Sequence, residues 1–173
     1  MTGIFLDIDQ SKLDDIVKNF DASKKVLDEA GKKAISKTVN WIRQTALVEI
    51  EAKTKVPKAV LSSRAKVYLD KDKAWFGAYR INFIRLGAKQ VAGGVQAGSI
   101  FIPGAFIAKL RDGASEGVYK RKGKAKFPVV GFKKVIAQDV ENVVKNDILN
   151  KVNDKLLENL KEELSEWEIN KNS

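Results

Sequence analysis

The chain has 173 residues, of which 44% are hydrophobic, and its 32 basic and 22 acidic residues give a net charge of +10. It contains no cysteine and no histidine, which excludes disulfides, thiolate zinc sites, a cysteine nucleophile and histidine-based acid–base chemistry. The length predicts one domain with an ordinary core, and we expect no enzymatic activity, no cofactor and no metal.

The N-terminal residues predict a short strand and a short helix. Apolar and polar side chains alternate from Gly3 to Asp9, which is the period of a strand with one buried face. A capping Ser11 and apolar residues at helical spacing up to Phe20 then predict a helix. No signal peptide and no apolar run of membrane-spanning length is found, so we expect a soluble product that makes no membrane contact.

A long amphipathic helix is predicted over about residues 22–52. This run has no proline, follows Asp21 as an N-cap, and repeats apolar residues from Val26 to Ile50 at helical spacing. Such a helix would span roughly 45 Å, which is more than a compact domain of this size needs. We therefore expect part of the helix to contact another subunit.

The middle of the chain, about residues 64–130, has the composition of strands. A brief helical turn at Pro57 comes before it. The glycine-rich stretch 87–98 inside it is expected to be either a flexible loop or a poorly packed hairpin. The first two predicted strands form a hairpin and the last three an antiparallel meander. The predicted strands are residues 64–70, 73–81, 104–109, 117–121 and 127–130.

A second long helix is predicted over about residues 135–167, because apolar residues from Ile136 to Trp167 recur every 3.6 positions opposite an acidic face. The elements together predict an α+β fold. In this fold an antiparallel β-sheet in the middle of the chain packs against long N-terminal and C-terminal helices, within one domain over residues 1–173.

Positive charge is concentrated in the middle of the chain. Residues 1–52 carry 8 basic and 9 acidic residues, residues 53–134 carry 19 and 4, and residues 135–173 carry 5 and 9. The net charges of the three segments are therefore −1, +15 and −4. This asymmetry favours an anionic partner, either nucleic acid or an acidic protein surface. A solvated lysine-rich surface is the alternative.

Patterns that would indicate catalysis are missing. The glycine-rich stretch has neither the Gly-Lys-Ser/Thr ending of a phosphate-binding loop nor the spaced glycines of a dinucleotide site. The paired acids Asp7/Asp9 and Asp14/Asp15 are explained as solvated or helix-capping residues. The sequence therefore favours a binding or structural role.

Basic residues near aromatic ones form the candidate contact site for DNA or a partner protein. Tyr119 precedes this run and Phe127 follows it, and such a mixture can bind phosphates and stack on bases. Ion pairs to a neighbouring subunit or simple exposure are the alternatives. Trp41, Trp75 and Trp167 are expected to be core or interface anchors. The candidate contact residues are Arg111, Lys120, Arg121, Lys122, Lys124 and Lys126.

Four short motifs occur in a fixed order between Ile84 and Val130, and this order resembles the prophage minor tail protein Z family, the tail completion proteins of long-tailed phages. The motifs cover about a quarter of the chain, and the layout of a basic sheet between two long helices is also similar. Tyr119 stands where the family more often has phenylalanine. The residues that carry the resemblance are Arg85, Leu86, Gly87, Pro103, Gly104, Ala105, Phe106, Val118, Tyr119, Phe127 and Pro128.

The resemblance implies a structural, non-catalytic role in the virion, at the head-proximal end of a phage tail, after assembly in the host cytoplasm. By analogy with related neck proteins, we expect a homo-oligomeric ring, a hexamer, that joins the tail terminator to the head connector and has phage DNA in its lumen. Ring closure pairs unlike faces, which the −4 and +15 segments would supply. A stand-alone basic DNA-binding protein is the alternative function.

Overall fold

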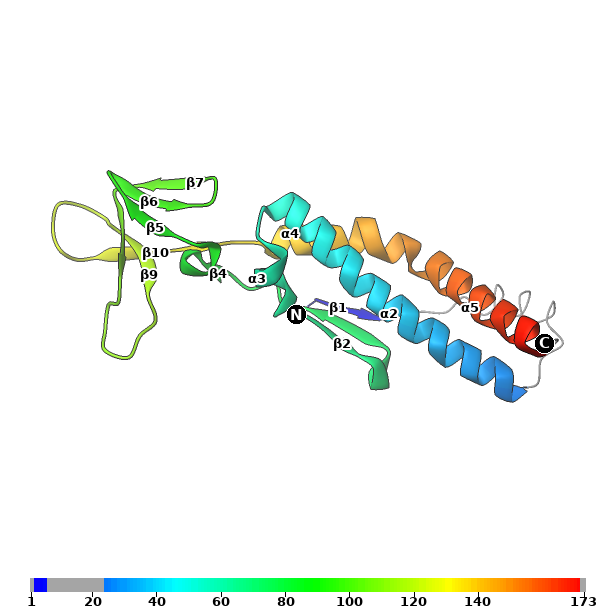
Figure 1. Ribbon diagram of the computed structural model, residues 1–173. Helices are drawn as coiled ribbons and strands as arrows, with labels where there is room; N and C mark the ends of the chain where they lie inside the picture. The colour runs from blue at the N-terminus through cyan, green and yellow to red at the C-terminus, as the bar shows by residue number, and fades with distance from the viewer. Residues whose placement is uncertain (1, 6–23, 172–173) are drawn as a thin grey trace. The chain divides into compact units, whose positions relative to one another are not determined.

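The computed structural model describes residues 2–5 and 24–171 (Figure 1). The helix predicted over residues 11–20 lies outside the described residues. Contacts within the chain define two compact units. We call Met1–Gly77 with Asp139–Ser173 the helical unit, and Ala78–Gln138 the sheet unit. The expectation of one domain over residues 1–173 stays a prediction.

The predicted α+β fold class is confirmed, with long helices near both ends of the chain and antiparallel strands between them. The strands form three sheets rather than the single sheet expected. Strands β1, β3 and β2 form one sheet in the helical unit, and the other two sheets form the sheet unit.

Two long helices dominate the helical unit. Helix α2 spans Lys24–Thr54, close to the prediction. It ends where Lys55 adopts a left-handed conformation with φ of 57°, shortly before Pro57, a common way to stop a helix. The C-terminal helix begins as α4, Ala137–Asn142, passes through a π-helical segment, Val143–Leu149, and continues as α5, Asn150–Lys171. The sequence pattern does not reveal this π-helical segment.

Helices α2 and α5 pack through small residues against leucines. Ala30 and Ala34 of α2 face the leucines of α5 and so allow the helices to approach closely. A buried polar pair adds to this seam, since Asn159 donates a hydrogen bond to the Thr38 hydroxyl at 2.8 Å. The buried residues of this cluster are Ala30, Ala34, Leu156, Leu160 and Leu164.

The sheet of the helical unit contains the first predicted hairpin. In the turn of this hairpin Asp72 adopts a left-handed conformation, with φ of 48°. The Arg43 side chain of α2 donates a hydrogen bond to the carbonyl of Ala65, which ties β2 to the helix. The short helix α3, Lys58–Ser62, precedes the hairpin as predicted. The strands of this sheet are β1 (Thr2–Phe5), β2 (Ala65–Tyr68) and β3 (Lys73–Phe76).

The sheet unit is a two-layer β-sandwich. One sheet has the strand order β4-β10-β9-β8 and the other has the order β5-β6-β7, all antiparallel. The prediction of one strand over residues 73–81 is wrong. Strand β3 ends at Phe76, and Ile81 begins a separate strand, β4, which belongs to a different sheet. The strands are β4 (Ile81–Asn82), β5 (Lys89–Val91), β6 (Gly94–Ala97), β7 (Ile100–Pro103), β8 (Ala105–Ala108), β9 (Gly117–Arg121) and β10 (Val129–Lys134).

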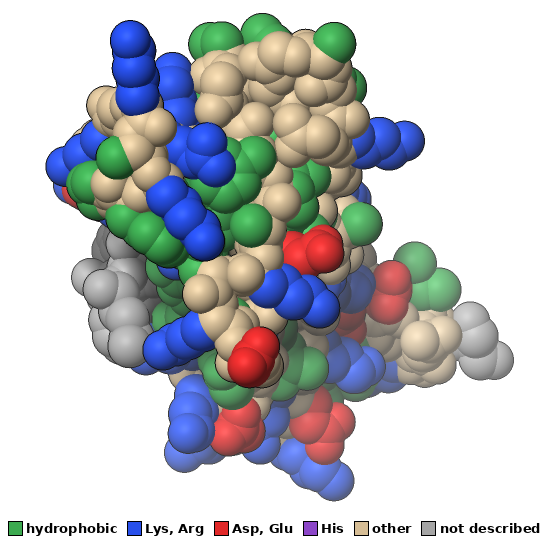
Figure 2. Space-filling model, turned by 90° about the vertical axis from the view of Figure 1, so that its left-hand side faces the viewer, with side chains coloured by type: hydrophobic (Ala, Val, Ile, Leu, Met, Phe, Trp, Pro, Cys, Tyr) green, Lys and Arg blue, Asp and Glu red, His purple; other side chains and the backbone are tan. Residues whose placement is uncertain are grey.

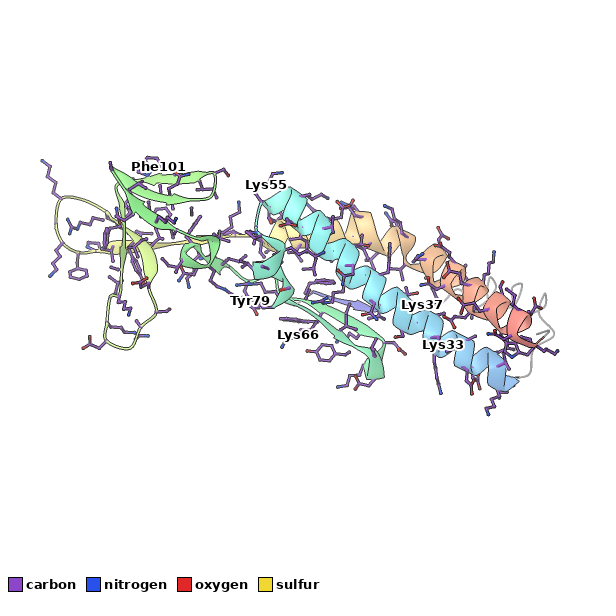
Figure 3. The ribbon with its side chains drawn as sticks, viewed as in Figure 1. Lys33, Lys37, Lys55, Lys66, Tyr79 and Phe101 are labelled. Carbon is purple, nitrogen blue, oxygen red and sulfur yellow. The ribbon has the colours of Figure 1, made fainter. Side chains whose placement is uncertain are left out.

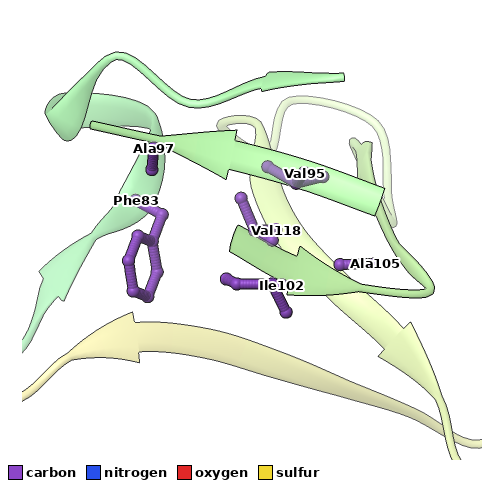
Figure 4. Packing of buried hydrophobic residues seen from close by; sticks show 6 residues of the cluster. All are labelled: Phe83, Val95, Ala97, Ile102, Ala105 and Val118. Carbon is purple, nitrogen blue, oxygen red and sulfur yellow. The ribbon is translucent and has the colours of Figure 1, made fainter. Parts of the chain in front are cut away.

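The core of the sandwich lies between its two sheets (Figure 4). Val95 and Ile102 come from the three-stranded sheet, whereas Ala105 and Val118 come from the four-stranded one. Residues 87–98 form a hairpin of β5 and β6, so of the two expected alternatives the flexible loop is wrong. The hairpin is also better packed than expected in β6, since Val95 is 0% exposed. Gly94 is required there because a Cβ would lie 2.3 Å from the carbonyl oxygen of Ile102.

The meander of the last three strands is confirmed, since β8 pairs with β9 and β9 with β10. The final strand is displaced from its predicted range of 127–130. It begins at Val129 and continues to Lys134, directly before the C-terminal helix. Pro128 lacks an amide hydrogen and so suits the position before the strand.

Candidate functional site

The net charge of the protein belongs to one of its two units. The sheet unit has 12 basic and 2 acidic residues, a net charge of +10, whereas the helical unit has 20 of each. The sheet unit is therefore the part of the chain that an anionic partner would be drawn to.

Charged residues of the helical unit pair with one another. Lys37 of α2 lies 2.6 Å from a carboxylate oxygen of Glu163 in α5, and Lys33 lies 3.5 Å from the other oxygen (Figure 3). The hydrogen bond from Lys37 lowers the pKa of Glu163, against the effect of burial, and the same bond raises the pKa of Lys37. These charges stabilise contact between two helices.

The candidate cations of the sheet unit differ from Lys33 and Lys37. Among the described residues, none of the six candidate contact residues is in an ion pair. Only Asp112 and Glu116 carry negative charge in this unit, and both are exposed near the β8–β9 connection. The view in Figure 2, which faces the sheet unit, shows Lys and Arg side chains beside exposed hydrophobic ones at the upper left.

The pleat of the four-stranded sheet divides the predicted basic cluster. Residues directly opposite one another on paired strands share a face. Lys120 pairs with Ala105, which lies in the sandwich core, so Lys120 is on the inner face, whereas Arg121 is on the outer face. We call the following residues the outer face, by the register of the strands: Phe106, Ala108, Gly117, Tyr119, Arg121, Val129, Gly131 and Lys133.

Two aromatic rings lie at the centre of the outer face. The ring centroids of Phe106 and Tyr119 are 6.3 Å apart, and the Arg121 guanidinium is 5.6 Å from the centroid of Phe106. The Tyr119 ring leans over two glycines that leave room for it. A Cβ on Gly117 would lie 2.6 Å from the Tyr119 hydroxyl, and one on Gly131 would lie 3.4 Å from the ring. The glycines thus make room for the half-buried Tyr119 ring, which is tilted by 38° from the ring of Phe106.

Two hollows open on this side of the sheet. One has a volume of about 300 Å³ and is lined by Phe106, Arg121, Lys126 and Phe127, among others. The Lys126 ammonium is 6.0 Å from the centroid of the Phe127 ring, which is 62% exposed. The other hollow has a volume of about 680 Å³, and its lining residues are Tyr79, Arg80, Gly131, Phe132 and Lys133.

The structure brings only some of the predicted contact residues together. Arg121 and Lys126 line the smaller hollow, whereas Lys120 is on the opposite face of the sheet. Lys122 and Lys124 are exposed between β9 and β10, and Arg111 is exposed between β8 and β9. Sequence reasoning missed Lys109, Leu110, Arg80 and Lys133, which also line the hollows. Of these four residues only Lys133 lies in a strand, and the others come from connecting segments whose path the sequence pattern does not predict.

The residues that carry the family resemblance have structural roles in the sheet unit. Gly87 and Gly104 have left-handed φ values of 73° and 69°, which glycine adopts without strain. Ala105 and Val118 are buried in the core, and Leu86 packs against it. Pro128 accepts a hydrogen bond from the Lys122 amide and so closes the connection between β9 and β10. Phe106, Tyr119 and Phe127 are the members of the set that belong to the outer face or its smaller hollow.

The described residues contain no group of three or more acidic side chains placed to hold a metal ion. None of the described helices is both long and apolar enough to cross a membrane. No protein-family model, curated protein or solved structure matches the chain.

Proposed function

We propose that this chain is a structural assembly protein, not an enzyme, and that it acts as a tail completion protein at the head-proximal end of a phage tail. In this role it helps to join the tail to the head connector and to position the end of the genome. It is incorporated into the virion after assembly in the host cytoplasm, as a homo-oligomeric ring of six subunits that also contacts the tail terminator.

One observation supports this proposal above the others. The motifs that resemble the tail completion family all fall within the sheet unit, where they build a single sandwich that also carries the whole net charge of +10. An assembly protein needs such a surface, since complementary charge selects and orients its neighbours. The helical unit has a net charge of zero and supplies a different surface, as a ring built from unlike faces requires.

Mass measurement of the purified protein, alone and mixed with phage tail tubes, tests the proposal. We expect a ring of several subunits that joins the tubes at one end. A product that stays strictly monomeric and never joins tails would contradict the proposal.

A stand-alone DNA-binding protein is the second candidate, because the six candidate cations have no ion-pair partners among the described residues. Titration with duplex DNA separates the two functions. Nanomolar binding by the isolated monomer, with a steep dependence on salt, would favour this second candidate. Weak duplex binding together with ring formation would favour the assembly protein.

A further inference from the structure

We propose that the outer face of the four-stranded sheet, with the smaller hollow beside it, binds single-stranded nucleic acid. This inference goes beyond the assembly role and does not depend on it. It rests on the arrangement of aromatic rings, cations and glycines on one side of β8, β9 and β10.

The chemistry of the outer face matches unpaired bases attached to phosphates. Phe106, Tyr119 and Phe127 supply ring surfaces, and two of these rings have a cation within about 6 Å, at 5.6 Å for Arg121 and 6.0 Å for Lys126. Base stacking on aromatic side chains with cations along the backbone is how proteins bind single strands without sequence preference. The hollow of about 300 Å³ has the size of a small-ligand site, which suits one base.

A duplex cannot use this surface equally well. Its bases are stacked on one another and paired, so that only phosphates and groove edges are offered to the protein. Exposed rings such as that of Phe127, which is 62% exposed, would then contribute little. An acidic polypeptide would pair with Arg121 and Lys126 but has no flat group for the rings. The aromatic component therefore favours single strands over both alternatives.

The other sheet of the sandwich offers a matched control. Phe101 of β7 is 47% exposed and lies on the three-stranded sheet (Figure 3), and it is not among the residues that line the candidate hollow. Lys89 of β5 is exposed on that same sheet. Loss of Phe101 removes an exposed ring, as loss of Phe127 does, and loss of Lys89 removes one positive charge, as loss of Arg121 does. A larger loss of affinity with the Phe127 or Arg121 variant than with its control would therefore show that the position of the side chain matters.

The test is a fluorescence anisotropy titration of the whole chain with labelled oligothymidylate of about 16 nucleotides, the upper end of single-strand site sizes. A duplex of the same length and polyglutamate are compared at the same salt concentration. We expect about tenfold tighter binding to the single strand than to the duplex, and about a tenfold loss with Phe127→Ala. Phe101→Ala should change the affinity less than about twofold, and Arg121→Gln should weaken binding more than Lys89→Gln.

Several results would overturn the inference. These are equal affinity for single strand and duplex, equal effects of Phe127→Ala and Phe101→Ala, preference for polyglutamate, or no binding at all. Because Phe127 and Arg121 are exposed, their variants are expected to fold, which circular dichroism checks. Ring formation is measured separately by mass, so failure of this inference is distinguishable from failure of the assembly proposal.

Discussion

The two units of the chain use their charged side chains differently. In the helical unit equal numbers of acids and bases are present, and Lys33 and Lys37 pair with the buried Glu163 of the facing helix. In the sheet unit the bases outnumber the acids by 12 to 2, and cations such as Arg121 lie over aromatic rings instead.

Net charge alone therefore does not identify a binding surface in this protein. Lysines occur throughout the helical unit, yet those that pair with acids on the facing helix contribute to folding. The six candidate cations of the sandwich are in no ion pair among the described residues, and folding there depends on the apolar core and on glycine backbone geometry. Removal of a paired charge from the helical unit should therefore lower its stability. Removal of an exposed charge from the sandwich should weaken binding and leave stability almost unchanged.

The largest effect is expected from Gly94→Ala in the sandwich core. The new Cβ would meet the carbonyl oxygen of Ile102 at 2.3 Å, so the β6–β7 pair must shift. We expect the free energy of unfolding to fall by about 3 kcal/mol, the upper range of overpacking effects. Thermal unfolding measures this, with hydrogen exchange to show that the loss includes residues 78–138. Gly123→Ala is the control, since nothing lies within 4 Å of its Cβ position, and an equal loss there would refute the explanation.

The next effect concerns the buried polar pair between α2 and α5. Asn159 is 3% exposed and Thr38 is 0% exposed, and Asn159→Ala removes their hydrogen bond and leaves a cavity. We expect a loss of about 2 kcal/mol in unfolding free energy. Denaturant unfolding followed by tryptophan fluorescence is suitable, because Trp41, Trp75 and Trp167 all belong to the helical unit. The exposed Asn170→Ala should cost less than about 0.5 kcal/mol, and a similar cost at both sites would argue against the buried pair.

A smaller and pH-dependent effect is expected at Lys37. Because its hydrogen bond lowers the pKa of Glu163, the stabilisation is complete above the pKa of an unfolded glutamate, about 4.3, and is lost as the pH falls through the lower folded value. The raised pKa of Lys37 means that the same contribution is also lost in strong alkali, as the pH rises through the folded value.

Lys37→Met should therefore cost about 1 kcal/mol at neutral pH, a modest figure because Lys37 is 44% exposed. It should also reduce the loss of stability on acidification. Unfolding curves at a series of pH values measure both effects. Lys25→Met is the control, since its pair with Glu29 is at the surface of one helix. Parallel acid profiles for the wild type and Lys37→Met would contradict this assignment.

The smallest effect on stability is expected from cations between β9 and β10. Lys122, Lys124 and Lys126 are exposed, and among the described residues none is in an ion pair. Their combined replacement by glutamine should change the unfolding free energy by less than about 0.5 kcal/mol. Calorimetry checks this value, and a loss comparable to that of Lys37→Met would mean that these charges also serve folding.

Much of the fold could be predicted because it depends on local periodicity. The helix predicted over residues 22–52 was found at Lys24–Thr54, and the strand predicted at 117–121 was found with the same limits. The close packing of the stretch 87–98 could not be predicted, because its glycines suggest flexibility. Only the structure shows that Gly94 is needed for the backbone of Ile102 to approach closely. The candidate site was only partly predictable for a related reason. Consecutive basic residues look like one cluster in sequence, but strand pleating sends Lys120 and Arg121 to opposite faces.

We infer that assembly depends on the positive charge of the sandwich, whereas folding of the helical unit does not depend on that charge. Charge reversal of Lys120, Arg121 and Lys122 to glutamate tests it most directly, by mass measurement of the variant alone and with phage tail tubes over a range of salt concentrations. We predict that the variant folds but no longer forms rings or joins tails, whereas the wild type does both more weakly as salt rises. Ring formation and tail joining by the variant with unchanged salt dependence would contradict the claim.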